Sequence, residues 1–206
     1  MKATPSTQED AVLGLVRRRG LLRAREAAAL KLPTVVITRL VRSGRLARVG
    51  RGLYSLPDVQ ISAQHELAQV ALRAPRGVVC LLTALRVHEI GTQSPFQVWL
   101  ALPPGISPPR MTSPQLRVVR MSGVSLTEGI TLIKIDGVPV PVFDAAKTIV
   151  DCFKYRNKIG LDVALEALRE GWRERKANKL TMDALWRYAE IDRVAGVMRP
   201  YLESLV

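Results

Sequence analysis

Apolar residues in the first sixty positions recur first at helical spacing and then at strand spacing. Helices are predicted over Thr7–Gly20, Leu21–Leu30 and Thr34–Ser43, where apolar residues return every three or four positions. Glu9 and Asp10 would then be acids in the first turn of the first helix. Within 45–56, two short alternating strands flank a Gly-Arg-Gly turn. Three helices followed by a basic hairpin are typical of a winged helix-turn-helix.

The third of these helices has two different faces. At about 100° per residue, one face collects the apolar residues Val36, Ile37, Leu40 and Val41. The other face collects Thr34, Val35, Thr38, Arg39, Arg42 and Ser43. We expect the first face to pack and the second to meet a partner. Val35 has two interpretations: contact with a thymine methyl group, or packing against the wing or the second helix.

The pattern changes after a connector at 58–62. Strands are predicted over Phe96–Leu102, Leu116–Met121, Ile130–Ile135 and Val138–Val142, with a short buried segment at Val78–Leu82. Helices are predicted over Ser62–Ala74, Thr83–Ile90, Asp144–Phe153, Gly160–Trp172, Thr181–Ile191 and Ala195–Leu205. The proline-rich run Pro103–Pro114 is predicted to be a loop or a flap.

These elements predict an α+β fold with two domains. An N-terminal winged helix-turn-helix DNA-binding domain is expected over residues 1–58. A mixed α/β domain with a small sheet and a helical C-terminus is expected over residues 62–206.

Composition agrees with a folded chain of one or two domains. The chain has 206 residues, of which 48% are hydrophobic and 24% charged, which is enough apolar material for a core. No apolar signal segment follows the N-terminus, and the longest apolar stretch, Val78–Leu82, is too short to cross a bilayer. Cys80 and Cys152 lie far apart without a CxxC pattern, which disfavours a disulfide framework or a zinc site. We therefore expect a cytoplasmic protein with no membrane contact, no metal and no cofactor.

Charge narrows the choice of partner. The formal net charge is +13, and residues 1–58 alone carry 12 basic and 4 acidic side chains. Between Arg17 and Arg51, eleven basic residues accompany one acid, Glu26. A surface that only serves solubility mixes both signs, so this segment favours a polyanion such as DNA.

Duplex DNA suits the predicted fold because an α-helix fits the major groove. Arg39 and Arg42 are expected to pair with guanine edges, while Thr34 and Thr38 would hold phosphate or a base edge. Arg48 and Arg51 on the wing would contact the DNA backbone or the minor groove. Lys31, Val35 and Arg45 complete the predicted DNA-binding set.

Catalytic patterns in the second half of the chain are poor. The sequence contains no HExxH, no Walker loop and no GxGxxG. Asp144, Lys147 and Asp151 are similar to the acid-lysine set of nucleases, but their spacing puts them on one helix rather than at a strand edge. Ordinary packing is favoured for His65 and His88, and a core thiol for Cys152. The favoured interpretation is a non-enzyme, and a nuclease-like enzyme targeted by the winged helix is the alternative.

The order of these parts resembles the AbiEi-type antitoxins of bacterial type IV toxin-antitoxin systems, which are associated with abortive phage infection. The segment Arg48–Tyr54 is similar to the wing signature of that family. In the second domain, Thr83–Ile90, a following strand with Trp99, and Asp144–Asp151 are similar to the family's antitoxin domain. Family members often have an arginine where Lys147 stands.

The resemblance implies a function for each domain. The protein would repress its own operon by binding inverted repeats in the promoter, with two copies on one operator through a homodimer or cooperative binding. The second domain would oppose a nucleotidyltransferase-like toxin without forming a stable complex, with His88, Asp144, Lys147 and Asp151 as its candidate residues. A module whose basic face meets an acidic protein is a third interpretation.

Overall fold

The computed structural model describes residues 5–50, 52–57, 64–111 and 113–205. Contacts divide the chain into two compact units. The N-terminal unit comprises Met1–Ala68 and Lys134–Pro139, and the C-terminal unit comprises Gln69–Ile133 and Val140–Val206. The expected connector at 58–62 lies outside the described residues, so the predicted domain boundaries stay a prediction.

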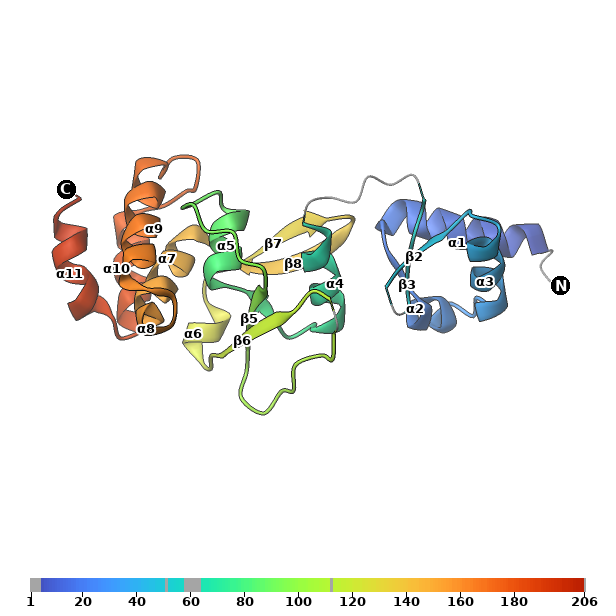
Figure 1. The fold of residues 1–206 in the computed structure, drawn as a ribbon, viewed down its shortest axis with the longest axis horizontal. Helices are drawn as coiled ribbons and strands as arrows, with labels where there is room; N and C mark the ends of the chain where they lie inside the picture. Colours follow the sequence, from blue (N-terminus) through green and yellow to red (C-terminus); the bar gives the residue numbers. More distant parts are fainter. Residues whose placement is uncertain (1–4, 51, 58–63, 112, 206) are drawn as a thin grey trace. The chain divides into compact units, whose positions relative to one another are not determined.

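Within the N-terminal unit, the described residues 5–50 and 52–57 form three helices and a small sheet (Figure 1). Its elements are α1 (Pro5–Arg19), β1 (Leu22–Arg23), α2 (Ala24–Ala29), α3 (Thr34–Arg42), β2 (Ala47–Gly50) and β3 (Leu53–Ser55). The strands are antiparallel and lie in the order β1-β3-β2. Their core is aliphatic and includes Val12, Val16, Leu22, Ile37 and Leu40. The predicted arrangement of three helices and a hairpin is confirmed.

The start of the second helix differs from the prediction. Leu22 and Arg23 form a strand that pairs with Tyr54 and Leu53 of β3, and α2 begins only at Ala24. The backbone N–H of Arg23 donates to Glu26 Oε2 at 3.3 Å, which favours a helix start directly after Arg23. Local helical spacing does not reveal this strand, because its partner lies about thirty residues further along the chain.

The beginning of the first helix also differs. α1 begins at Pro5 and has no acid in its first turn. Glu9 and Asp10 therefore lie one turn deeper in the helix than predicted, where their carboxylates contact arginines instead of the helix N-terminus.

A mixed five-stranded sheet has the order β6-β5-β4-β8-β7. Its strands are β4 (Val78–Val79), β5 (Val98–Leu102), β6 (Leu116–Arg120), β7 (Ile130–Ile135) and β8 (Val138–Phe143). β5 pairs antiparallel with β4 and parallel with β6. A parallel neighbour needs a long connection, which explains the proline-rich loop between β5 and β6 that projects from the sheet in Figure 1.

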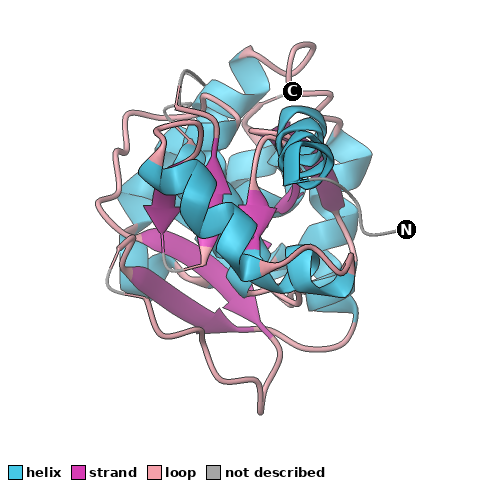
Figure 2. Cartoon of the chain, turned by 90° about the vertical axis from the view of Figure 1, so that its right-hand side faces the viewer, coloured by secondary structure: helices cyan, strands magenta, loops and turns pink. Residues whose placement is uncertain are grey.

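Helices account for most of the regular structure (Figure 2). They are α4 (His65–Arg73), α5 (Leu81–Val87), α6 (Val124–Thr127), α7 (Ala145–Lys154), α8 (Arg156–Ile159), α9 (Leu161–Arg173), α10 (Met182–Ile191) and α11 (Ala195–Glu203). The one-turn helices α6 and α8 were not predicted, because four residues carry no periodicity. The predicted α+β class and helical C-terminus are confirmed. No described helix is both long and apolar enough to span a bilayer.

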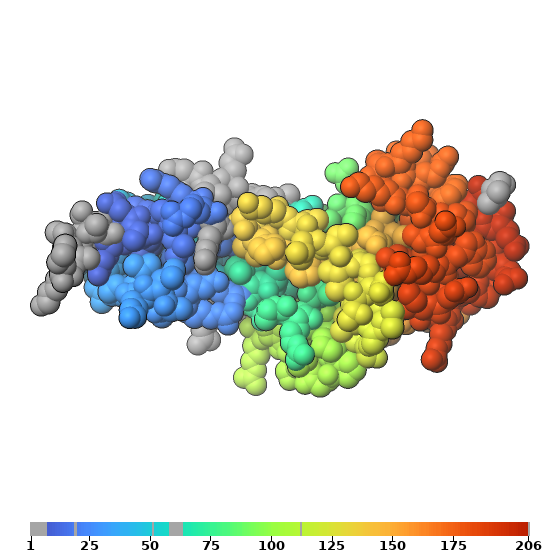
Figure 3. Space-filling model, turned by 180° about the vertical axis from the view of Figure 1, so that it is seen from behind, coloured from blue at the N-terminus to red at the C-terminus, as the bar shows by residue number. Residues whose placement is uncertain are grey.

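Helix α7 is the centre of the C-terminal core. Residues Ala145 to Phe153 are all buried, and α5, α9 and α10 pack against this helix. The turn between α9 and α10, orange in Figure 3, projects from the same unit. Because these residues of α7 have no exposed face, their polar side chains need partners inside the protein.

Candidate nucleic-acid interface

Helix α3 has the two faces that its sequence predicts. Val36, Ile37 and Leu40 are at most 6% exposed and join the core of the N-terminal unit. On the opposite face, Thr34, Val35, Thr38, Arg39 and Arg42 are exposed. The helix ends at Arg42, and Gly44 follows with φ +69°, as expected of a C-terminal cap.

Val35 is a large apolar residue on the exposed face of α3. It is 67% exposed, so the interpretation that it packs against the wing or the second helix is wrong. Thr38 Oγ1 donates to the carbonyl oxygen of Thr34 at 3.1 Å, which leaves the hydroxyl oxygen free to accept.

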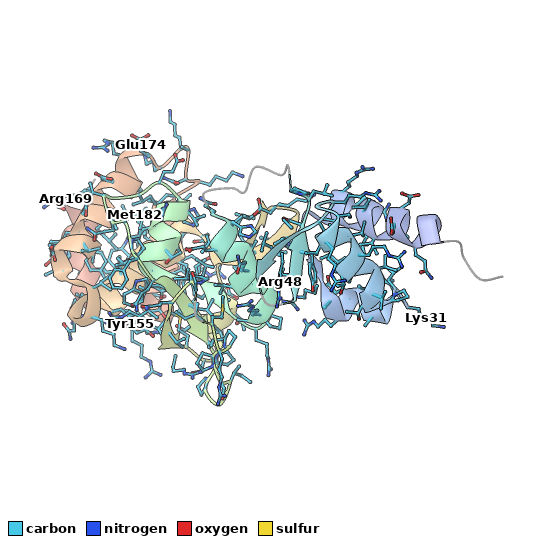
Figure 4. The ribbon with its side chains drawn as sticks, turned by 45° about the vertical axis from the view of Figure 1, so that its right-hand side comes forward. Lys31, Arg48, Tyr155, Arg169, Glu174 and Met182 are labelled. Carbon is cyan, nitrogen blue, oxygen red and sulfur yellow. The ribbon has the colours of Figure 1, made fainter. Side chains whose placement is uncertain are left out.

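Lys31 occupies the turn before α3. Its φ is +56°, a left-handed conformation, and its backbone N–H donates to the Ala28 carbonyl to close α2. The side chain is exposed and points away from this unit (Figure 4). A cation is thereby placed beside the start of the exposed helix face.

The wing is formed by β2 and β3, whose pairing shifts register between Arg48 and Gly50. Arg48 is exposed, and its Nε donates to the Gly50 carbonyl at 3.4 Å. Gly52 follows with φ +68°, which suits a tight hairpin turn. Arg51, the other predicted wing contact, lies outside the described residues.

An acid on α1 holds two of the predicted DNA-binding arginines. Glu9 Oε2 lies 2.8 Å from Arg45 Nη1, and Glu9 Oε1 lies 3.6 Å from Arg39 Nη1. Asp10 Oδ1 is 4.0 Å from Arg45 Nη2. Sequence reasoning missed these contacts because it used both acids to stabilise the start of the helix.

Asp144 caps α7. Its Oδ1 accepts from the backbone N–H of Lys147 at 2.8 Å, and its Oδ2 accepts from the Tyr188 hydroxyl at 2.9 Å. Both carboxylate oxygens therefore hold the protein together, one within α7 and one toward α10.

Lys147 and Asp151, also proposed from the sequence, are completely buried. Lys147 Nζ donates to Asp151 Oδ1 at 2.5 Å and to Asp192 Oδ2 at 2.9 Å. Lys154 Nζ extends the network, lying 2.8 Å from both Asp192 Oδ1 and Ser125 Oγ. A substrate cannot touch Lys147 or Asp151 in this arrangement, so the network joins α6, α7 and the end of α10 instead.

The pKa values agree with one buried network. Burial lowers the pKa of Lys147, but the charges of Asp151 and Asp192 outweigh burial and leave this pKa raised. Burial raises the pKa of Asp151 well above its usual range. Burial also acts to raise the pKa of Asp192, yet hydrogen bonding to Asp151 and the charge of Lys147 lower it to about 2. Lys147 and Asp192 therefore form the charged pair of the network.

His88 and Asp144 meet at a pocket of about 400 Å³ in the C-terminal unit. His88 Nε2 lies 2.7 Å from the Phe143 carbonyl oxygen and, because a carbonyl only accepts, carries the proton. The other polar lining residues are Thr131, Asn178 and Lys179, which sequence reasoning did not single out. Lys147 and Asp151 do not line this pocket, so the structure separates the four candidate antitoxin residues into two pairs.

The remaining titratable candidates are held inside the fold. His65 Nδ1 lies 2.6 Å from Asp136 Oδ2 in the N-terminal unit. Cys80 and Cys152 are buried and unbridged, and burial raises the pKa of both thiols, which confirms the prediction of a core thiol for Cys152. Among the residues that the structure describes, no three His, Cys, Asp or Glu side chains are grouped as metal ligands.

The N-terminal segment is similar to a known family. Residues 10–57 match the family described as "Transcriptional regulator, AbiEi antitoxin". The predicted resemblance to AbiEi-type antitoxins is therefore confirmed over the helices α2 and α3, most of α1, and the wing. The description is that of a regulator and antitoxin, not of an enzyme.

Solved structures that are similar to this chain include one that covers most of it. The RV2827C protein from Mycobacterium tuberculosis superposes with a TM-score of 0.54 at 14% identity, over 89% of this chain and 71% of that chain. At this identity the similarity concerns the fold alone. A search of curated proteins gave no significant match.

Proposed function

We propose that this protein is a DNA-binding transcriptional autorepressor and the antitoxin of a type IV toxin-antitoxin system. The observation that carries the proposal is the exposed face of α3, where Thr34, Val35, Thr38, Arg39 and Arg42 lie together opposite a buried aliphatic face. The match of residues 10–57 to a family of transcriptional regulators supports the same conclusion.

The exposed face of α3 enters the major groove. Arg39 and Arg42 pair with guanine edges, and Val35 contacts a thymine methyl group. Lys31, Thr34, Thr38, Arg45, Arg48 and Arg51 contact phosphates or groove edges and fix the register of the protein on the duplex. Neutralising these phosphates releases counterions, which accounts for the positive charge of this segment.

The operator contains inverted repeats in the promoter of the protein's own operon. Each repeat takes one copy of the chain, because the reading surface of one α3 covers one half-site. The two copies bind as a homodimer or cooperatively on the DNA. This regulation takes place in the cytoplasm.

The C-terminal unit counters a nucleotidyltransferase-like toxin encoded beside the antitoxin, without a stable complex. The solvent-accessible candidates for this activity are His88 and Asp144, which line the 400 Å³ pocket. The buried Lys147 and Asp151 support the fold of this unit rather than contacting the toxin's substrate. No metal or cofactor is required.

A two-part cellular experiment tests the proposal. A reporter behind the protein's own promoter measures repression, and co-expression of the neighbouring toxin gene measures growth rescue. We expect the double variant Arg39→Ala/Arg42→Ala to lose repression and keep rescue.

The matched control is Arg169→Ala/Arg193→Ala, which removes the same charge from exposed arginines of the C-terminal unit and should leave repression intact. Equal repression by both double variants would disprove DNA reading by α3. Absence of rescue by the wild-type chain would disprove the antitoxin function.

A further inference from the structure

We infer that Glu9 is a positioning residue that makes DNA binding selective, by holding Arg39 in a fixed orientation on the exposed face of α3. The inference rests on the proposed DNA-binding function and assigns a role to α1, a helix that contributes no residue to the predicted DNA-binding set. Each oxygen of the Glu9 carboxylate contacts a different arginine, Arg39 at 3.6 Å and Arg45 at 2.8 Å.

The two contacts tie α1 to the exposed face of α3 and to the turn that follows this helix. Arg39 lies within α3, and Arg45 lies in the turn that follows it. The Glu9 side chain is only 17% exposed, whereas the side chains of Arg39 and Arg45 are 56% and 48% exposed. The acid is thus fixed by the protein, while the guanidinium groups reach solvent.

Neither folding stability nor affinity for DNA explains an acid at position 9. Ion pairs with half-exposed arginines add little to folding stability. A negative charge near DNA phosphates opposes binding to any sequence. An acid at this position is therefore useful when it orders the arginines that it contacts.

An arginine side chain with a fixed orientation favours base recognition over phosphate contact. A free arginine has many rotamers and can reach any nearby phosphate. A guanidinium paired through Nη1 with a fixed acid presents its remaining N–H groups, on Nε and Nη2, in one direction, as paired contacts to guanine O6 and N7 require. Arg42 serves as the internal comparison, since no acidic partner for it is found among the described residues.

The test compares Glu9→Gln with Asp10→Asn by fluorescence anisotropy at fixed salt. Both variants remove one negative charge, and the two positions are adjacent on α1. Asp10 differs from Glu9 because its side chain is 72% exposed and its nearest arginine contact, from Oδ1 to Arg45 Nη2, is longer at 4.0 Å. The probes are the duplex best bound by the wild-type protein in a randomised library, and a scrambled duplex of equal length. Selectivity is the ratio of the two dissociation constants.

We expect Glu9→Gln to bind the scrambled duplex more tightly and to lose about fivefold or more in selectivity, since a bidentate base contact discriminates by about that factor at least. Asp10→Asn should strengthen binding to both duplexes equally. In an Arg39→Ala background, Glu9→Gln should leave the ratio unchanged, because the residue through which Glu9 acts is absent. Thermal melts within about 2 °C of wild type would show that the variants fold.

Three results would overturn the inference: no loss of selectivity in Glu9→Gln, an equal loss in Asp10→Asn, or an undiminished loss in the Arg39→Ala background. If the wild-type protein shows no preference for any duplex, the proposed function fails as well. If the wild type is selective and Glu9→Gln is equally selective, only the role of Glu9 is disproved.

Discussion

Lys147 shows how a residue that suggests chemistry in the sequence can serve the fold instead. Its ammonium group lies between Asp151 and Asp192 with no exposed surface. Asp151 is four residues away on the same helix, so their pairing follows from helical spacing. Asp192 is 45 residues away and nothing local in the sequence indicates it. The predicted set therefore placed Lys147 and Asp151 on one helix but did not include Asp192.

Replacing Lys147 by methionine should destabilise the C-terminal unit by about 3 to 5 kcal/mol, because it breaks the buried ion pair with Asp192 and leaves Asp151 Oδ1 and Asp192 Oδ2 without the donor that they share. Tryptophan fluorescence during urea unfolding measures this effect, since Trp99, Trp172 and Trp186, the chain's only tryptophans, all belong to that unit. Lys176→Met, at an exposed position, is the control and should change stability by less than about 0.5 kcal/mol. Equal midpoints for the two variants would contradict the structural role.

Among the secondary-structure elements, those with strong periodicity were predicted well. α3, α7 and α9 were recognised because their apolar residues recur at helical spacing. β1 was missed because two residues become a strand only by pairing with β3. The true start of α1 at Pro5 was missed because Glu9 and Asp10 imitate first-turn acids. Local periodicity therefore predicts the longer elements, whereas contacts with distant residues decide a short strand such as β1.

The entry into β7 gives a test of close packing between elements. Gly129 has φ +73°, and its carbonyl accepts from the Asp144 N–H at 2.7 Å, next to the cap of α7. A Cβ at this position would lie 2.8 Å from Lys147 Cβ and 3.0 Å from the Tyr188 hydroxyl oxygen. Neither neighbour can move without disturbing the buried network or the α7 cap.

Gly129→Ala should therefore cost about 1 to 3 kcal/mol more than its backbone strain alone. Gly105→Ala is the matched comparison, because Gly105 has φ +79° and nothing lies within 4 Å of the place that an alanine Cβ would take there. We expect about 1 kcal/mol for Gly105→Ala, from the left-handed backbone only. Urea midpoints from tryptophan fluorescence compare the two, and similar losses would show that the site near Lys147 is not tightly packed.

The two units of the chain use their positively charged side chains differently. The N-terminal segment concentrates cations around α3 and the wing, whereas the C-terminal unit uses two of its cations, Lys147 and Lys154, inside or beside a buried network. The basic surface around α3 was predicted from the excess of arginine and lysine in the sequence. The buried network of Lys147 and Lys154 was not predicted, because burial depends on how α7 packs against α10.

Salt dependence measures how much of the DNA affinity comes from phosphate contacts. If six or more phosphates are contacted, affinity should fall about 10³-fold or more between roughly 50 and 200 mM salt. Arg48→Ala should reduce the slope of log affinity against log salt by about one on specific and scrambled duplexes alike. Arg169→Ala should leave the slope unchanged. A flat dependence in the wild type would favour a basic face that meets an acidic protein.

The most direct test of the central claim, that the exposed face of α3 reads DNA sequence, is the selectivity of Arg42→Ala. The ratio of dissociation constants for scrambled and library-selected duplexes should fall by the equivalent of about 1 to 3 kcal/mol, since one paired contact to a guanine is lost. Arg169→Ala should keep the wild-type ratio. Equal weakening of both duplexes by Arg42→Ala, with the ratio preserved, would contradict base reading by α3.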